Sequence, residues 1–232
     1  MRSSVHLALG AAAALSLATA AVPANAATPH GASVVLGPEV GGYVLRGVND
    51  SVDATFTVPR WSCGAQDEGV TTVVTSLGQG REIGGAGVEA SCVDGHKSIR
   101  AAFMTPAGGV FPIDETVRGG DAIRVSIVIS GEDLSITVRN LTRLWGVGTG
   151  QPDQGGDLTA AVVGDARLSV DGQELPIPAF RHHQVAGLEL DGASPDPRRA
   201  SKESLVGDDG AVLVRPSHLH DGATAFTLRS TV

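Results

Sequence analysis

The sequence predicts an all-β protein, organised as a sandwich or a barrel. Short runs of alternating or β-branched residues recur along the chain, and turn sequences such as Asp171-Gly172, Asp191-Gly192 and Asp221-Gly222 separate them. After residue 26, no stretch of useful length repeats apolar residues at the helical period of roughly 3.6 residues. Many short strands joined by Gly/Asp turns are typical of β-sandwiches and barrels, whereas helical folds need that longer period.

The clearest local prediction is a β-hairpin formed by residues 122–129 and 134–139. Both runs alternate apolar and polar residues, and the sequence Ser130-Gly131-Glu132-Asp133 joins them. Because successive side chains of a strand point to opposite faces, the alternation places the apolar residues on one face. We therefore expect two antiparallel strands that rest on a core through Ile123, Val125, Ile127, Ile129, Leu134, Ile136 and Val138.

Other segments have the composition of strands and are bounded by turn residues or prolines. They are residues 54–59, 70–77, 98–105, 160–163, 166–170, 185–190, 211–214 and 224–228. Residues 194–210 contain two prolines and many charges, so we predict a long polar loop there. We find no internal repeat and no linker after residue 41, so a single β-sandwich domain is expected at residues 41–232.

The first 26 residues have the three parts of an export signal. Arg2 supplies the positive charge, residues 7–22 are apolar and uncharged, and Ala24-Asn25-Ala26 fits the small-x-small cleavage pattern. An uncleaved membrane anchor is the alternative interpretation. The apolar run is short for a membrane span, which argues against it. We therefore expect a secreted protein that is cleaved after Ala26, with residues 27–40 as a flexible lead-in and no later membrane span.

Charge and cysteine content restrict the partners of the chain. Binding to nucleic acid needs clustered Lys and Arg, but the formal net charge is −8 and the only lysines are Lys97 and Lys202. We therefore expect no nucleic acid partner.

In an exported protein the two cysteines, Cys63 and Cys92, are most simply explained by one disulfide. A metal site is the other interpretation, although no CxxC or paired ligand lies nearby.

Histidines are the other candidates for metal ligands. His182, His183, His218 and His220 could bind a metal, because histidines two positions apart on a strand share one face. Solvated loop histidines are the alternative, and we expect neither a metal nor a cofactor. The chain also lacks a Gly-x-Ser-x-Gly sequence, so the sequence nominates no serine nucleophile.

Several short motifs are weak signals individually, but their order along the chain is characteristic of a protein family. They are Gly42-Tyr43, Ala54-Thr-Phe-Thr-Val-Pro59, Cys63 with Cys92, Gly119-Gly-Asp121-Ala-Ile123, Val138-Arg-Asn-Leu-Thr142, Leu175-Pro-Ile-Pro-Ala-Phe180 and Asp221-Gly-Ala-Thr-Ala-Phe226. This order resembles that of the secreted glutamic endopeptidases, the eqolisins, and particularly their bacterial members. The resemblance implies an antiparallel two-sheet β-sandwich, a concanavalin-like jelly roll with a concave face. We expect a monomer.

The chemistry of that family depends on a Glu and a Gln that face each other across the concave sheet. The Glu activates a water as general base, and the Gln polarises the scissile carbonyl. Counting back from Cys92 places the Gln position at Gly85, and the motif Ala102-Phe103-Met104-Thr105-Pro106 places the Glu position at Phe103. Neither residue can transfer a proton, so the resemblance implies that the catalytic dyad is not retained.

The aromatic residues of the family's cleft are also missing. The resemblance leads us to expect tryptophans near Val40, Val73 and Ala102, yet aromatic residues make up only 3% of the chain. A groove that grips peptide side chains is usually richer in aromatic residues. We therefore predict a non-catalytic binding protein whose ligand is a peptide, a glycan or a cell-surface partner.

A divergent secreted glutamic-type endopeptidase, or another hydrolase, is the alternative function. Glu82 and Glu89 flank Gly85 and are the nearby carboxylates that could have taken over catalysis. Glu89 has a second interpretation, as a surface charge beside the disulfide of Cys92.

Overall fold

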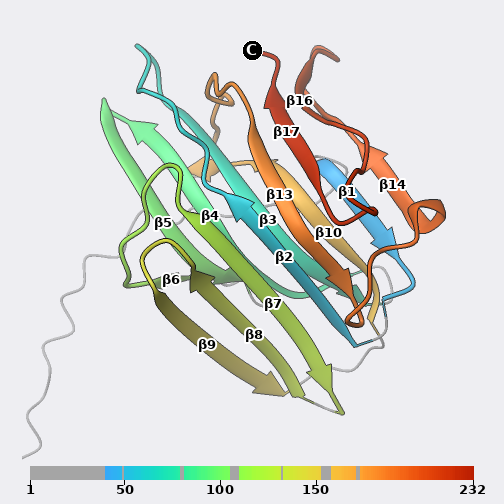
Figure 1. The fold of residues 1–232 in the computed structure, drawn as a ribbon. Coiled ribbons are helices and arrows are strands. Elements are labelled where there is room, and N and C mark those ends of the chain that lie inside the picture. The colour runs from blue at the N-terminus through green and yellow to red at the C-terminus, as the bar shows by residue number, and fades with distance from the viewer. Residues whose placement is uncertain are drawn as a thin grey trace, which may run out of the picture.

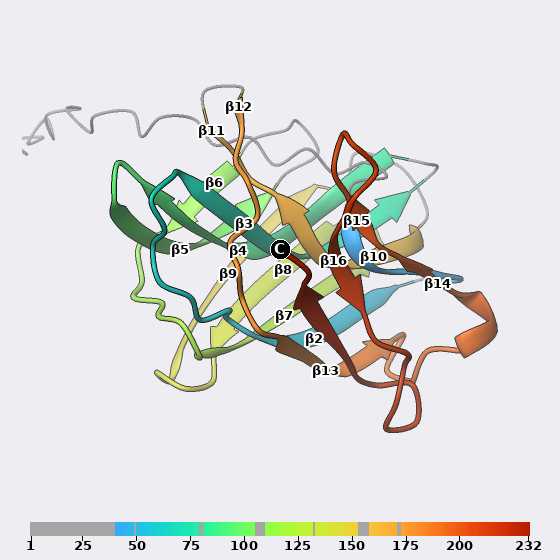
Figure 2. The same cartoon turned by 90° about the horizontal axis from the view of Figure 1, so that it is seen from above.

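The computed structural model describes residues 40–48, 50–78, 81–104, 110–131, 133–152, 158–170 and 173–232. For residues 81–83, 151–152 and 169–170 it describes the backbone alone. The predicted signal peptide lies outside the described residues, as does the predicted lead-in except for Val40. Two antiparallel sheets pack face to face, which confirms the predicted β-sandwich (Figures 1 and 2).

The first sheet has seven strands in the order β14-β1-β10-β3-β4-β5-β6, and every neighbouring pair is antiparallel. Its strands, in chain order, are β1 (Val40–Arg46), β3 (Glu68–Gly78), β4 (Arg81–Val93), β5 (His96–Met104), β6 (Val110–Ile113), β10 (Leu158–Arg167) and β14 (Ala200–Glu203). The long strands β3, β4 and β10 form its centre.

The second sheet has eight strands in the order β15-β16-β17-β13-β2-β7-β8-β9. They are β2 (Ser51–Thr57), β7 (Ala122–Ser130), β8 (Asp133–Asn140), β9 (Trp145–Pro152), β13 (His183–Leu190), β15 (Leu205–Val206), β16 (Val212–Pro216) and β17 (Phe226–Ser230). A small hairpin of β11 (Ser169–Val170) and β12 (Gln173–Glu174) and a 3-10 turn, η1 (Pro197–Arg199), complete the described elements. No helix among the described residues is long and apolar enough to cross a membrane.

The core fills the space between the two sheets. Side chains alternate along each strand, so every second residue enters this layer, as Val52, Ala54 and Phe56 of β2 do. Tyr43 of β1 and Phe226 of β17 meet edge to face across the layer, with their ring centroids 4.8 Å apart. Burial of this apolar surface is the main stabilising contribution to the fold.

The hairpin prediction is confirmed. Strands β7 and β8 pair in antiparallel register from Ile123–Asn140 to Ser130–Asp133. Of the seven apolar side chains predicted to face the core, all are buried except Ile129, which is half-buried and packs against the core.

Two strand-level predictions were wrong. Residues 160–163 and 166–170 were expected as separate strands, but β10 runs without a break through Gly164 and Asp165. Asp165 is fully buried, accepts a hydrogen bond from the Thr72 hydroxyl (2.7 Å) and contacts His183 Nε2 (2.7 Å). These tertiary partners satisfy the carboxylate inside the sandwich, where an unpaired one would be costly. The predicted polar loop at 194–210 also contains the short strands β14 and β15.

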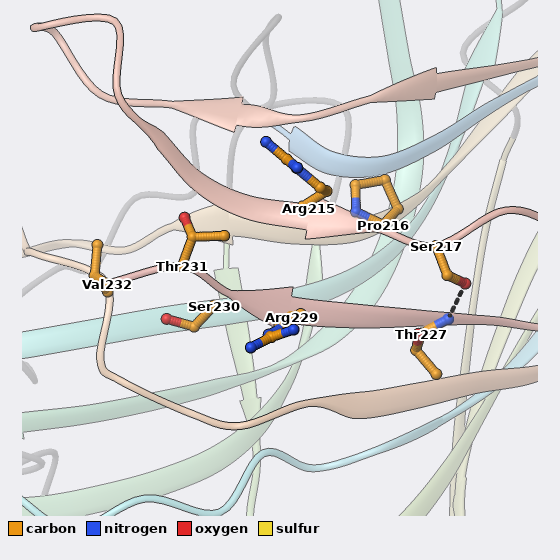
Figure 3. A pocket seen from close by; sticks show the side chains of 8 residues that line it. All are labelled: Arg215, Pro216, Ser217, Thr227, Arg229, Ser230, Thr231 and Val232. Carbon is orange, nitrogen blue, oxygen red and sulfur yellow. Dashed lines mark hydrogen bonds between the residues drawn. The ribbon is translucent and has the colours of Figure 1, made fainter.

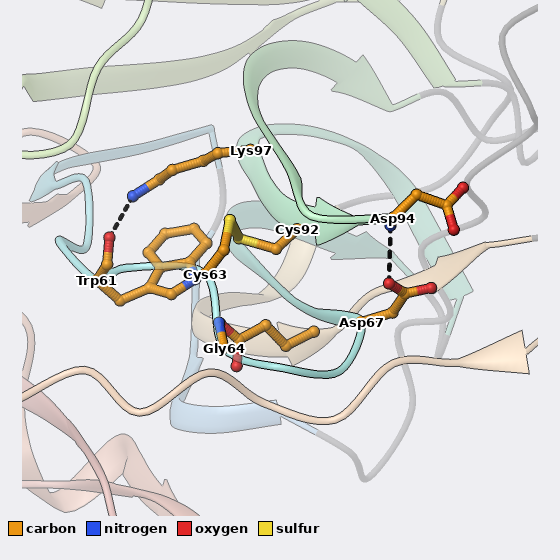
Figure 4. Close-up of a disulfide and its surroundings, with 8 residues drawn as sticks. Trp61, Cys63, Gly64, Asp67, Cys92, Asp94 and Lys97 are labelled. Atoms are coloured by element: carbon orange, nitrogen blue, oxygen red, sulfur yellow. Dashed lines mark hydrogen bonds between the residues drawn. A yellow bond between two sulfur atoms is a disulfide. The ribbon is translucent and has the colours of Figure 1, made fainter.

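The predicted disulfide between Cys63 and Cys92 is present in the structure (Figure 4). It ties the segment after β2, in the second sheet, to the end of β4 in the first sheet. The ammonium group of Lys97 lies 4.1 Å from the ring centroid of Trp61 on the same side. The disulfide and this cation–π contact therefore hold one end of the sandwich closed.

A buried carboxylate, Asp121, anchors the start of β7. It accepts hydrogen bonds from Asn140 Nδ2 (2.9 Å), Arg143 Nε (2.6 Å) and the Arg118 amide (3.0 Å). Burial alone would raise the pKa of Asp121, but these donors and the charge of Arg143 outweigh it and hold the pKa below its usual value. Two motifs that are distant in the sequence, at Asp121 and Asn140, are thus parts of one buried cluster.

The lowered pKa of Asp121 predicts acid sensitivity. The ionised carboxylate contributes stability that is complete above about pH 4, its unfolded pKa, and is lost as the pH falls through the lower folded pKa. We expect Asp121→Asn to lower the free energy of unfolding at pH 7 by about 2 kcal/mol. Urea unfolding between pH 7 and pH 2.5 measures this, and the difference from wild type should shrink below about pH 4.

The exposed Asp133, on the neighbouring β8, provides the control. Asp133→Asn should follow the wild-type profile throughout. A pH profile of Asp121→Asn that matches wild type at every pH would contradict a stabilising role for this carboxylate.

Candidate functional site

The face of the seven-stranded sheet that points away from the core is the candidate site, and we call it the outer face. Residues directly opposite on neighbouring strands share a face. Gly85 of β4 pairs with Thr75 of β3 and with Met104 of β5, whereas the adjacent Ala86 lies in the core cluster. Gly85 is therefore on the outer face. Because Val73 pairs with Gly164 of β10, the same face continues onto that strand.

The three positions where tryptophans were expected all belong to the outer face. Val73 pairs with Gly87 of β4, Ala102 pairs with the same glycine from β5, and Val40 pairs with Ala166 of β10. Val40 and Ala166 form a second apolar cluster with Val162, separate from the main core. The three positions at which the family resemblance predicts a tryptophan-lined cleft thus lie on one face, but small aliphatic side chains occupy them.

Phe103 does not share this face. It pairs with Ala86, is only 7% exposed and packs in the core between the sheets. Since neighbouring residues of a strand alternate, the side chain of Phe103 and the outward direction at Gly85 are on opposite sides of the sheet. Gly85 and Phe103 therefore do not face one another: the motif around Phe103 contributes Ala102 and Met104 to the outer face and Phe103 to the core.

The sheet is too tightly paired at Gly85 to accept a side chain without rearrangement. A Cβ atom there would lie 2.6 Å from Thr75 Cγ2 and 2.7 Å from the Val74 carbonyl oxygen. Gly164 is similar, since its Cβ would lie 2.5 Å from the Gly41 carbonyl oxygen. Real Cβ atoms do not approach backbone oxygens so closely, so the middle of the outer face is built from glycines that permit this spacing.

Glu89 is the carboxylate nearest the middle of the outer face among the described side chains. It pairs with Thr71 on one side and with Arg100 on the other. Arg100 Nε donates to Glu89 Oε2 at 2.5 Å, and Glu89 is only 4% exposed. The interpretation of Glu89 as a surface charge is therefore wrong, because it is a buried, ion-paired group.

Three buried oxygen atoms on the outer face lack a hydrogen-bond partner among the described residues. They are Glu89 Oε1 and the hydroxyl oxygens of Thr71 and Thr75. Thr71 is directly opposite Glu89, and Thr75 is directly opposite Gly85. Buried polar atoms are normally paired in folded proteins, so these three mark places where a bound group could donate or accept hydrogen bonds.

No second described carboxylate faces Glu89 across the outer face. Glu203 of the edge strand β14 shares the face, because it pairs with Gly42. Four strand spacings separate β14 from β4, or about 19 Å. Gly85 itself lies four positions from Glu89 along β4, or roughly 13 Å. The side chain of Glu82, the other predicted candidate, lies outside the described residues.

The histidines do not form a metal site in the described part of the chain. His183 is buried against Asp165, and its ring meets that of Phe180 edge to face. His182 and His218 are exposed, and His220 contacts its neighbour Asp221. No group of three or more His, Cys, Asp or Glu side chains converges among the described residues.

Comparison with known proteins agrees with this architecture. The profile of the Peptidase A4 family matches residues 38–184, more than half of the chain, so the chain belongs to the Peptidase A4 family. No curated protein matches the sequence. The match ends within β13. Of the strands after it, β15, β16 and β17 complete the eight-stranded sheet and β14 is an edge strand of the seven-stranded sheet.

Solved structures of glutamic peptidases have the same fold. Scytalido-glutamic peptidase, with a transition state analog inhibitor, matches with a TM-score of 0.68 and 19% identity, over 83% of this chain and 98% of that chain. SCP-B, an eqolisin in complex with the tripeptide Ala-Ile-His, has a TM-score of 0.63 and 20% identity over 83% and 98%. Aspergilloglutamic peptidase from Aspergillus niger has a TM-score of 0.58 and 21% identity over 71% and 99%.

The close spacing at Gly85 predicts the cost of adding a side chain there. We expect Gly85→Ala to lower the free energy of unfolding by about 1–3 kcal/mol, since the new Cβ would press on Thr75 and on the β3 backbone. Urea unfolding measures this cost. A control is Gly150→Ala on β9, where the nearest atom to the new Cβ is 3.9 Å away and the change should stay within about 0.5 kcal/mol. Equal stability of the two variants would show that β3 and β4 can separate freely.

Proposed function

We propose that this chain is an exported member of the Peptidase A4 family that binds peptides without cleaving them. The main observation in support of this proposal is the residue composition of the outer face around Gly85. Among the described side chains there, no carboxylate or carboxamide faces a second one, and glycines stand where reactive groups would have to project. General base catalysis on a peptide bond needs a positioned acceptor for a proton of water, and an oxyanion donor opposite it.

The ion pair of Glu89 supports a binding role for this residue. Arg100 holds one carboxylate oxygen, and the other oxygen remains buried and without a partner among the described residues. The hydroxyl oxygens of Thr71 and Thr75 on β3 are likewise buried and without a hydrogen-bond partner among the described residues. An extended peptide offers N–H and C=O groups at regular intervals, which suits such a row of fixed oxygen atoms.

A peptide is favoured over a glycan because of the family. The related SCP-B structure contains a tripeptide, and a structure of scytalido-glutamic peptidase contains a peptide based transition state analog. The disulfide and the predicted export signal support a secreted location. A binding assay can distinguish a peptide ligand from a glycan or a cell-surface ligand.

Two assays on the purified chain test the proposal. We expect no cleavage of reduced, carboxymethylated insulin B chain between pH 2 and pH 7 by mass spectrometry, and saturable binding of the same peptide by fluorescence anisotropy. Glu89→Gln should weaken binding about tenfold, since it removes the charge from an acceptor for peptide N–H groups. Thr71→Val should weaken binding by a smaller factor, while Glu203→Gln on the edge strand should leave it unchanged.

Cleavage that Glu89→Gln abolishes would overturn the proposal and establish the alternative, a divergent hydrolase that uses Glu89. Binding of a glycan in place of the peptide would also overturn it. Glu89→Gln and Glu203→Gln should both retain the wild-type near-ultraviolet circular dichroism, so that a change in binding reports on the site.

A further inference from the structure

The outward face of the eight-stranded sheet carries two arginine pairs on neighbouring strands. Arg124 of β7 is directly opposite Arg139 of β8, and Arg215 of β16 is directly opposite Arg229 of β17. Like charges in directly opposite positions repel one another and destabilise the pairing of the strands. An anion close to both guanidinium groups of a pair would relieve this repulsion.

The chain itself supplies an anion for the first pair. Asp53 of β2 accepts hydrogen bonds from Arg124 Nε (3.0 Å) and Arg124 Nη2 (2.8 Å) through the same carboxylate oxygen. Its charge offsets the repulsion between Arg124 and Arg139.

The second pair has no such partner among the described residues. Arg215 and Arg229 are exposed, and no described carboxylate forms an ion pair with either guanidinium. The two arginines line a pocket of about 460 Å³, together with Ser217, Thr227 and Ser230 (Figure 3). No Asp or Glu belongs to the lining.

The two arginines point to the same side of the sheet. Val214 and Leu228 are buried in the core, so Arg215 and Arg229, which come directly after them, face outward, whereas Ser230 is opposite Val214 and faces the core. The Ser217 hydroxyl is already satisfied, since it donates to the His218 carbonyl oxygen and accepts from the Thr227 amide. Two guanidinium groups that share one pocket, and that have no ion-pair partner among the described residues, suit a bound oxyanion.

We propose that the pocket of Arg215 and Arg229 binds a tetrahedral oxyanion, a phosphate or sulfate group. Guanidinium groups bind such oxyanions through paired N–H donors. The formal net charge of the chain is −8, which disfavours general accumulation of anions on the surface. Anion binding by this protein therefore depends on this local pair, and it is independent of the peptide site on the opposite sheet.

Calorimetric titration of the purified chain with sodium phosphate, and separately with sodium sulfate and sodium acetate, tests the proposal at pH 7.5 and constant ionic strength. We expect saturable binding of phosphate or sulfate that is tighter than that of acetate. Arg215→Gln and Arg229→Gln should each weaken binding about tenfold, which corresponds to about 1.4 kcal/mol.

Arg139→Gln is the matched control, because it removes an arginine from the other cross-strand pair, which Asp53 already neutralises. Its affinity for phosphate should equal that of wild type. A second measurement is thermal unfolding. In buffer without phosphate or sulfate, Arg229→Gln should raise the unfolding midpoint, since it removes the repulsion, and the gain in midpoint on adding phosphate should be smaller than in wild type.

Equal weakening by Arg139→Gln and Arg229→Gln would overturn the proposal, because it would indicate a general effect of surface charge. A linear response shared by all variants, or tighter binding of acetate than of phosphate, would overturn it as well. Failure of peptide binding at the outer face would leave these results unaffected, because no residue is common to the two sites.

Discussion

Packing of the two sheets against each other commits every second residue of each long strand to the apolar core. The rest of the molecule follows from this constraint. Val74, Ala86 and Phe103 must face inward, so Thr75, Gly85 and Met104 face outward. Since the period of a strand is two residues, a position cannot change faces without moving the whole strand by one residue and exposing its apolar side chains.

The few charged groups within the sandwich are there because they are paired. Asp165 reaches Thr72 within its own sheet and His183 in the other, and so provides a polar contact between the two layers. Asp121 collects three donors at the start of β7. Removing one partner from such a cluster would leave a buried polar group unsatisfied, which costs more than the hydrogen bond contributes when it is present.

The two outward faces of the sandwich differ in character. The outer face of the seven-stranded sheet is smooth at its middle, where glycines allow neighbouring strands to come close, and its central charge is held by the Glu89–Arg100 pair. The outward face of the eight-stranded sheet carries opposed arginines, and the chain neutralises one pair with Asp53. A fold shared with glutamic peptidases therefore presents two outward faces of different chemistry, and fold alone does not decide which chemistry a face performs.

The sequence by itself determined the all-β class, the β7–β8 hairpin and the disulfide, because alternation, turn residues and a pair of cysteines are local or nearly local signals. It missed β4, whose glycines have low strand propensity but are required by close strand pairing, and it broke β10 at Gly164 and Asp165, which resemble a turn. Only the tertiary structure decided that Phe103 belongs to the core, that Glu89 is buried against Arg100, and that Arg215 and Arg229 share a pocket. These facts depend on strand register and on contacts between residues distant in the sequence, which no local pattern specifies.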